Sequence, residues 1–215
     1  MKNKRNLISI LLVFTLLFSF APSVNASENA RVFMTSYFST ATSDLTHASN
    51  GFKKLNYSTS THWNPSRYAI LNWTNSGGND YSNNNYAFYI STHGPTDEAA
   101  QAGTTFFTDN YGVQITPSDI TGNWHLVYID ACNSKRNSNF PIALNITGKS
   151  NRAYLGWATT VNAVPANTFN NYFWETYVTK YPLQQAAINA AANVPGSGTT
   201  PIRFSGDTSW YGYAS

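Results

Sequence analysis

Two unbroken apolar runs constrain the fold of this chain more than any other feature of its sequence. The runs Tyr86-Ala87-Phe88-Tyr89-Ile90 and Leu126-Val127-Tyr128-Ile129 are long enough for strands and too short for helices. A continuous apolar run implies a strand that is buried on both faces, as in the parallel sheet of an α/β protein. The sequence therefore predicts a mostly parallel central sheet with helices on both faces.

Strand-like and helical patterns alternate along the rest of the chain. A hairpin is expected from residues 104–107 and 113–115, and exposed or polar stretches from residues 58–64 and 75–85. Further strands are predicted at residues 32–38, 153–158 and 202–204, and helices at residues 45–55, 68–73, 140–146, 165–180 and 183–193. No internal repeat or linker interrupts this order, so residues 27–215 are expected to form a single domain.

Residues 1–26 have the pattern of a secretory signal peptide. Basic residues near the start precede the apolar stretch from Leu7 to Phe20 and a small-x-small site at Val24-Asn25-Ala26. The apolar stretch is shorter than the roughly 20 residues of a membrane-spanning helix. We expect a secreted or envelope-associated protein without a transmembrane segment in the mature chain; a retained N-terminal anchor is the alternative.

Charge argues against nucleic acid as a partner. Three of the 13 basic residues lie in residues 1–26, which leaves ten basic and ten acidic residues in the expected mature chain. A neutral chain lacks the basic surface that binds phosphates. Three of the histidines, His47, His62 and His125, show no zinc-ligand spacing, so no metal site is expected. No cofactor is expected either, because the chemistry of the reactive side chains described next requires none.

Reactive side chains follow both apolar runs. The first leads through Ser91 to His93-Gly94, and the second through Asp130 to Cys132, which is the only cysteine. Functional groups collect at the carboxyl ends of parallel strands, so neighbouring strands would bring His93 and Cys132 together. A thiol beside an imidazole is the arrangement of nucleophilic catalysis. The N–H groups of Gly94 and Cys132 would form an oxyanion hole, since glycine allows a carbonyl to approach the backbone.

These two strand-end motifs resemble those of the clan CD cysteine peptidases, the caspase, gingipain and metacaspase type. The resemblance extends over about residues 32–206 and includes Leu155-Gly156-Trp157 as the strand after the nucleophile. It implies a three-layer caspase-like fold for residues 27–215 and a peptide or protein substrate. Cys132 would attack the peptide carbonyl to form an acyl-enzyme, and His93 would protonate the leaving amine.

The same resemblance suggests a specificity. In metacaspase-like members, the residues two before the cysteine and two before the histidine line a pocket for a basic P1 side chain, which here are Asp130 and Ser91. Trp157 would form a wall of that pocket. Because the Gln-Ala-Cys-x-Gly string of true caspases is absent, cleavage after Arg or Lys is expected rather than cleavage after Asp.

Simpler interpretations stay open for each residue. Cys132 also fits an inert buried thiol, His93 a histidine satisfied in a turn, and Asp130 a carboxylate that caps a turn. The main alternative function is a catalytically silent module of the same fold that binds a surface or a partner. A serine or metal hydrolase is disfavoured, since neither Gly-x-Ser-x-Gly nor His-Glu-x-x-His occurs.

Overall fold

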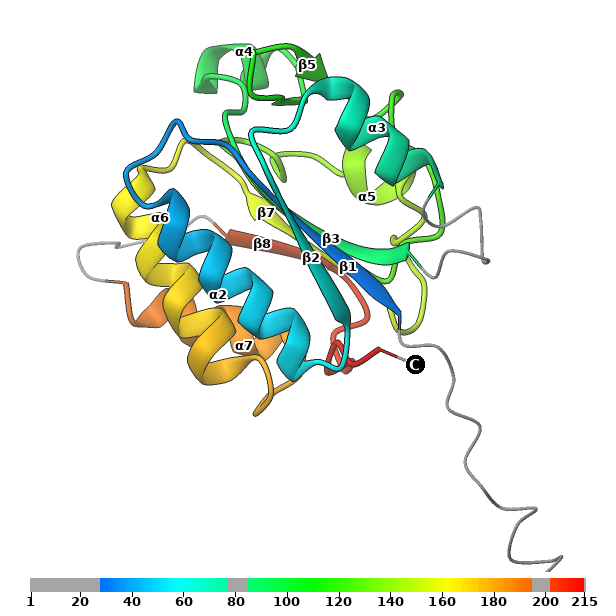
Figure 1. Cartoon of the computed structure of the whole chain (residues 1–215), viewed down its shortest axis with the longest axis vertical. Coiled ribbons are helices and arrows are strands. Elements are labelled where there is room, and N and C mark those ends of the chain that lie inside the picture. The colour runs from blue at the N-terminus through cyan, green and yellow to red at the C-terminus, as the bar shows by residue number, and fades with distance from the viewer. Residues whose placement is uncertain (1–27, 77–84, 195–201, 215) are drawn as a thin grey trace, which may run out of the picture.

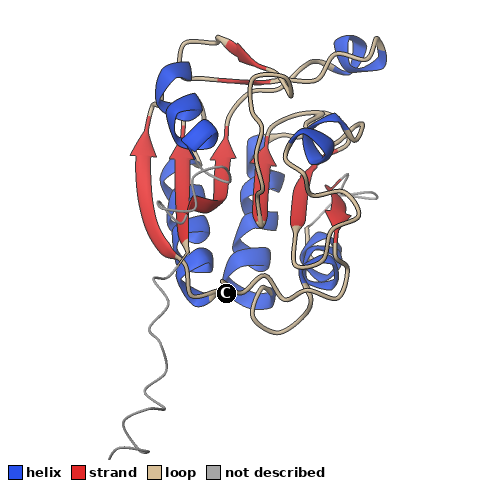
Figure 2. Ribbon diagram, turned by 90° about the vertical axis from the view of Figure 1, so that its right-hand side faces the viewer, coloured by secondary structure: helices blue, strands red, loops and turns tan. Residues whose placement is uncertain are grey.

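The computed structural model describes residues 28–76, 85–194 and 202–214, and its centre is a six-stranded sheet in the order β2-β1-β3-β6-β7-β8 (Figures 1 and 2). All neighbouring strands pair in parallel except β7 and β8, which are antiparallel. The predicted mostly parallel α/β sheet is thus confirmed. The strands are β1 (Asn29–Met34), β2 (Ser58–Trp63), β3 (Asn85–Ser91), β6 (Leu126–Asp130), β7 (Ala153–Trp157) and β8 (Ile202–Gly206).

Helices cover both faces of the sheet, as expected (Figure 1). One face carries α2 (Ala41–Lys54), α6 (Ala163–Asn170), the π-helical segment η2 (Asn171–Tyr177) and α7 (Leu183–Ala192). The other face carries α3 (Arg67–Ser76) and α5 (Asn139–Ala143). Beyond the carboxyl ends of the strands lie α4 (Asp97–Gln101) and a short hairpin, β4 (Phe107–Thr108) and β5 (Gln114–Ile115).

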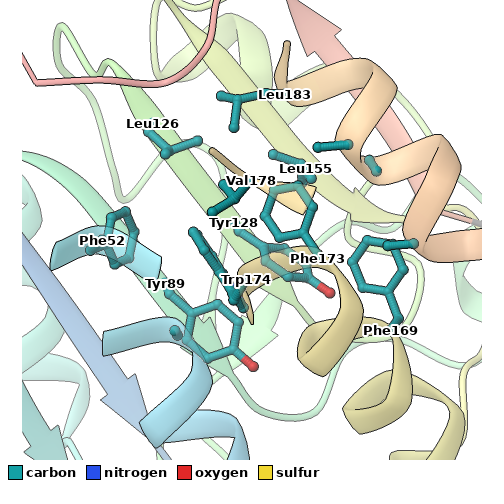
Figure 3. Close-up of a cluster of buried hydrophobic side chains, with 14 of the residues drawn as sticks. Phe52, Tyr89, Leu126, Tyr128, Leu155, Phe169, Phe173, Trp174, Val178 and Leu183 are labelled. Carbon is teal, nitrogen blue, oxygen red and sulfur yellow. The ribbon is translucent and has the colours of Figure 1, made fainter. Parts of the chain in front are cut away.

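Each face of the sheet packs into its own apolar cluster. Tyr89 and Tyr128 project from β3 and β6 toward Trp174 on η2, and Phe52 on α2 packs against the same Trp174 ring (Figure 3). Phe88 and Val127, one residue earlier on each strand, face the opposite cluster. This alternation explains why both runs are apolar throughout: every position faces a layer of helices.

Three local predictions differ from the structure. The polar stretch 58–64 contains an edge strand, β2, which needs little apolar surface because one of its long sides has no neighbouring strand. The first strand ends at Met34 rather than at residue 38. The helix expected over residues 165–180 changes to π-helical geometry after Asn170, with a bond from the Val178 N–H to the Phe173 carbonyl at 2.9 Å.

Some expectations fall on residues that lie outside the described part of the chain. These are the proposed signal peptide at residues 1–26 and most of the loop expected at residues 75–85. Within the described residues, no helix has the length and apolar character needed to cross a membrane.

Candidate active site

Strands β3 and β6 bring His93 and Cys132 to the same edge of the sheet. The two strands are parallel neighbours, and their last paired residues are Ser91 and Asp130. His93 and Cys132 each lie two residues beyond these strand ends. The Thr92 N–H donates to the Asp130 carbonyl at 3.1 Å, which carries the contact between the two chain segments past the strands. The two motifs therefore lie side by side, as nucleophilic catalysis by His93 and Cys132 would require.

A pocket of about 240 Å³ opens at this edge and is lined by both residues. Ser91 and Asp130, the other strand-end residues singled out from the sequence, also line it. Its remaining walls come from the ends of β3 and β6, from α2 and the segment before it, and from α6 and the segment before it. These parts contribute Thr92, Ala131, Phe38, Thr40, Asp44, Val161, Asn162, Ala163 and Ala166.

The imidazole of His93 is exposed to solvent and held by aromatic rings. Its centroid lies 4.8 Å from that of Tyr37 and 4.9 Å from that of Phe38. Its backbone is fixed too, because the His93 carbonyl accepts a hydrogen bond from the Thr108 N–H at 3.0 Å. The ring is therefore positioned by packing against the segment that follows β1.

Gly94 lies against the backbone of Cys132. A Cβ atom at residue 94 would lie 1.9 Å from the Cys132 carbonyl oxygen and 3.0 Å from the Cys132 nitrogen. No side chain fits there, so glycine is required by the contact of two chain segments as well as by any approaching substrate. The N–H groups of Gly94 and Cys132 consequently belong to adjoining backbone.

The thiol of Cys132 is partly buried and bonded to Val161. Sγ–H donates to the Val161 carbonyl at 3.6 Å, and the Val161 N–H donates to Sγ at 3.4 Å. Burial raises the pKa of the thiol, the bond from Val161 lowers it, and the nearby Asp130 charge raises it, with a net increase. The raised pKa favours the neutral thiol, so Cys132 needs a base before it can act as a nucleophile.

Asp130 is a buried carboxylate at the floor of the pocket. Its Oδ2 accepts hydrogen bonds from the Tyr89 hydroxyl at 2.7 Å and from Asn170 Nδ2 at 2.8 Å, and its Oδ1 accepts one from Trp157 Nε1. Burial, followed by the charge of Asp44, raises the pKa of Asp130 to about 6. The three donated hydrogen bonds stabilise the ionised carboxylate and so lower its pKa, but by less than burial and Asp44 raise it.

Asp44 is a second buried carboxylate of the pocket that sequence reasoning missed. One amide joins the pair, because Asn170 Nδ2 donates to Asp44 Oδ1 at 2.9 Å as well as to Asp130. The signal was present in the sequence: Asp44, Ala48 and Phe52 are spaced by four residues, which places an acid on the buried stripe of α2.

Trp157 has a different position from the other residues singled out. Its side chain is fully buried and is not among those that line the pocket. It lies beneath Asp130 and contacts the site through the bond from Nε1 to that carboxylate. The described part of the chain holds no cluster of His, Cys, Asp and Glu arranged to bind a metal ion.

Comparison with known proteins places the fold. No family model and no curated protein matches the sequence. Among solved structures, caspase-1 from Spodoptera frugiperda matches with a TM-score of 0.55 and 12% sequence identity, over 83% of this chain and 86% of that chain. A likeness at this identity carries the fold and not the catalytic residues. The chain therefore has a caspase-like fold.

Proposed function

We propose that the chain is an exported cysteine endopeptidase in which His93 and Cys132 form the catalytic dyad. The observation that carries the proposal is their shared pocket: an imidazole and the only thiol follow neighbouring parallel strands at the same distance from the strand ends. A nucleophile and an acid/base group that line one cleft are the minimum for acyl transfer through a covalent intermediate.

The resting thiol determines the order of the steps. Because burial raises its pKa, Cys132 gives up its proton as it attacks, and His93 accepts that proton. Sγ then forms a bond to the peptide carbonyl carbon, and the carbonyl oxygen becomes an oxyanion. His93 passes the proton to the leaving amine as the C–N bond breaks. A water molecule, deprotonated by His93, hydrolyses the acyl-enzyme and restores the thiol.

The oxyanion would be bound by the N–H groups of Gly94 and Cys132. Among the described residues, neither group donates to a backbone carbonyl of another residue. Preorganised donors of this kind typically contribute 10²–10³-fold to the rate of acyl transfer.

Two buried carboxylates support a preference for Arg or Lys at P1. Asp44 and Asp130 line the pocket, and the pocket lining contains no Lys or Arg. A guanidinium or ammonium group entering there would relieve the repulsion between the two acids. An Asp or Glu side chain would add a third negative charge to the same small volume, so it should be excluded.

A catalytically silent binding module is the second candidate, and one observation favours it. Within the described residues, the Cys132 thiol donates to the Val161 carbonyl and accepts from the Val161 N–H, while the His93 ring packs on Tyr37 and Phe38. A pocket with this lining would bind a basic segment of a partner without cleaving it.

Labelling with peptidyl electrophiles tests the proposal. Peptidyl acyloxymethyl ketones with Arg, Lys, Asn or Asp at P1 would be incubated with the native chain, with Cys132→Ala and with His93→Ala, followed by intact-protein mass spectrometry. We expect one adduct, with the Arg and Lys probes, that disappears in Cys132→Ala and forms more slowly in His93→Ala. Absence of a Cys132-dependent adduct across the panel would favour the silent module.

A further inference from the structure

A second cavity, of about 250 Å³, lies between α3 and the β1–β2 side of the sheet. It shares no lining residue with the pocket of His93 and Cys132. Arg31 and Phe33 face it from β1 and His62 faces it from β2. The helix supplies Tyr68, Asn72 and Trp73.

The position of Arg31 follows from the register of β1. Ala30, Val32 and Met34 pack into the apolar cluster under α2, so the alternate residues Arg31 and Phe33 face α3. Because β2 is the outermost strand, this part of the sheet face is incompletely covered, and Ser60 opposite Arg31 is exposed.

The charge of Arg31 is partly buried without a balancing acid. Its Nε is buried and has no hydrogen-bond partner, and within the described residues its guanidinium forms no ion pair. The guanidinium carbon lies 4.3 Å from the centroid of the Trp73 ring, in a cation–π contact. Burial also lowers the pKa of Arg31. A desolvated cation of this kind favours an anionic partner.

The lining selects among anions. No Asp or Glu lines the cavity, and Arg31 is its only permanently charged residue. Phosphate sites generally combine several cations or backbone N–H groups, whereas one guanidinium fork matches one carboxylate through two parallel bonds. Phe33, Tyr68 and Trp73 add aromatic walls, and the volume is below that of pockets for drug-sized ligands.

We infer that this cavity binds a small carboxylate that carries a flat apolar group. The carboxylate pairs with Arg31, and the apolar group packs against the aromatic side chains. The same chemistry is offered by a free aromatic acid and by a chain that ends in an aromatic residue. The site is separate from the proposed peptidase pocket and does not depend on peptidase activity.

Calorimetry with four probes tests the inference on the full mature chain. Benzoate represents a free acid, N-acetylphenylalanine a chain terminus, N-acetylphenylalaninamide the same body without charge, and inorganic phosphate an anion without an apolar group. We expect one-to-one binding of at least one of the two carboxylates in the millimolar range, and binding of the amide and of phosphate at least tenfold weaker.

Two substitutions in the cavity and one control substitution assign the binding to the cavity. Arg31→Gln should lower the affinity for the acid at least tenfold. Arg203→Gln, which removes an exposed guanidinium on β8 at the other edge of the sheet, should leave that affinity unchanged. Trp73→Leu, which keeps the charge, gives a second variant if Arg31→Gln does not fold, and it should also weaken binding. Measurable binding of N-acetylphenylalanine and of its amide with equal affinity, or no binding of either acid, would overturn the inference.

Discussion

Replacement of Asp44 by Asn isolates the contribution of the second carboxylate to substrate selection. Its Oδ1 accepts bonds from Nδ2 of Asn167 and of Asn170 at 2.9 Å, and the amide oxygen of the replacement retains both acceptor roles. The substitution therefore removes a charge while it preserves the shape of the pocket. A charge-assisted hydrogen bond contributes about 1.5–3 kcal/mol. At about 1.4 kcal/mol per factor of ten, kcat/KM for a P1 Arg substrate should fall about 10- to 100-fold.

A pair of fluorogenic peptides that differ only at P1, Arg against norleucine, provides the assay. We expect kcat/KM to fall for the Arg peptide and to change little for the norleucine peptide. Glu98→Gln, which neutralises an exposed acid on α4, is the matched control and should leave both values unchanged. An equal loss on both peptides would refute the reasoning, because Asp44 would then support the fold of the site rather than contact the P1 side chain.

Asp44→Asn should also change how the free energy of unfolding depends on pH. The pKa of Asp130 is about 6 in the folded chain and about 4 in the unfolded chain. This difference changes the free energy of unfolding by about 3 kcal/mol between low and high pH. Because the folded pKa is raised, this contribution is fully present below about pH 4 and is lost as the pH rises through about 6. Asp44→Asn removes one cause of the raised pKa, so the decline between about pH 4 and pH 7 should be smaller in urea unfolding.

Three further predictions concern the thiol, the strand-end contact and the core. The rate of Cys132 alkylation by iodoacetamide should increase with pH and reach its midpoint above that of a free cysteine, since burial raises the thiol pKa; a midpoint at or below that of a free cysteine would contradict this. Gly94→Ala should destabilise the chain by about 1–3 kcal/mol in thermal unfolding and abolish labelling. Gly148→Ala, which is strained by a φ of +69° but has no atom within 4 Å of the added Cβ, should also lower stability and yet retain labelling. Phe173→Ala should cost about 3–5 kcal/mol in denaturant unfolding, and a loss below 1 kcal/mol would show that the core described here is wrong.

The local sequence pattern was sufficient to predict the two strands that carry His93 and Cys132. Residues 86–90 and 126–129 are apolar at every position, and a strand between two layers of helices must bury both faces. His93 and Cys132 follow at equal distances from the ends of these strands, so their meeting at one edge depended only on the strands being parallel neighbours.

Local pattern was insufficient wherever a residue takes its role from a distant partner. Asp44 comes close to Asp130 only because α2 packs over β1, β2 and β3, and the amide that joins the two carboxylates comes from Asn170, at the junction of α6 and η2. The bond between Val161 and the thiol likewise depends on the path of the segment after β7. Edge strand β2 escaped detection because a strand paired on one side needs no apolar run.

The sequence by itself determined which segments are buried strands and which reactive groups follow them, because hydrophobic periodicity and chain order are local properties. Tertiary structure alone decided the acid pair in the pocket, the partners of the thiol and the isolated charge of Arg31 over Trp73. These features arise from contacts between residues far apart in the chain, and desolvation, which sets the pKa values of Asp130 and Cys132, exists only once the layers have packed.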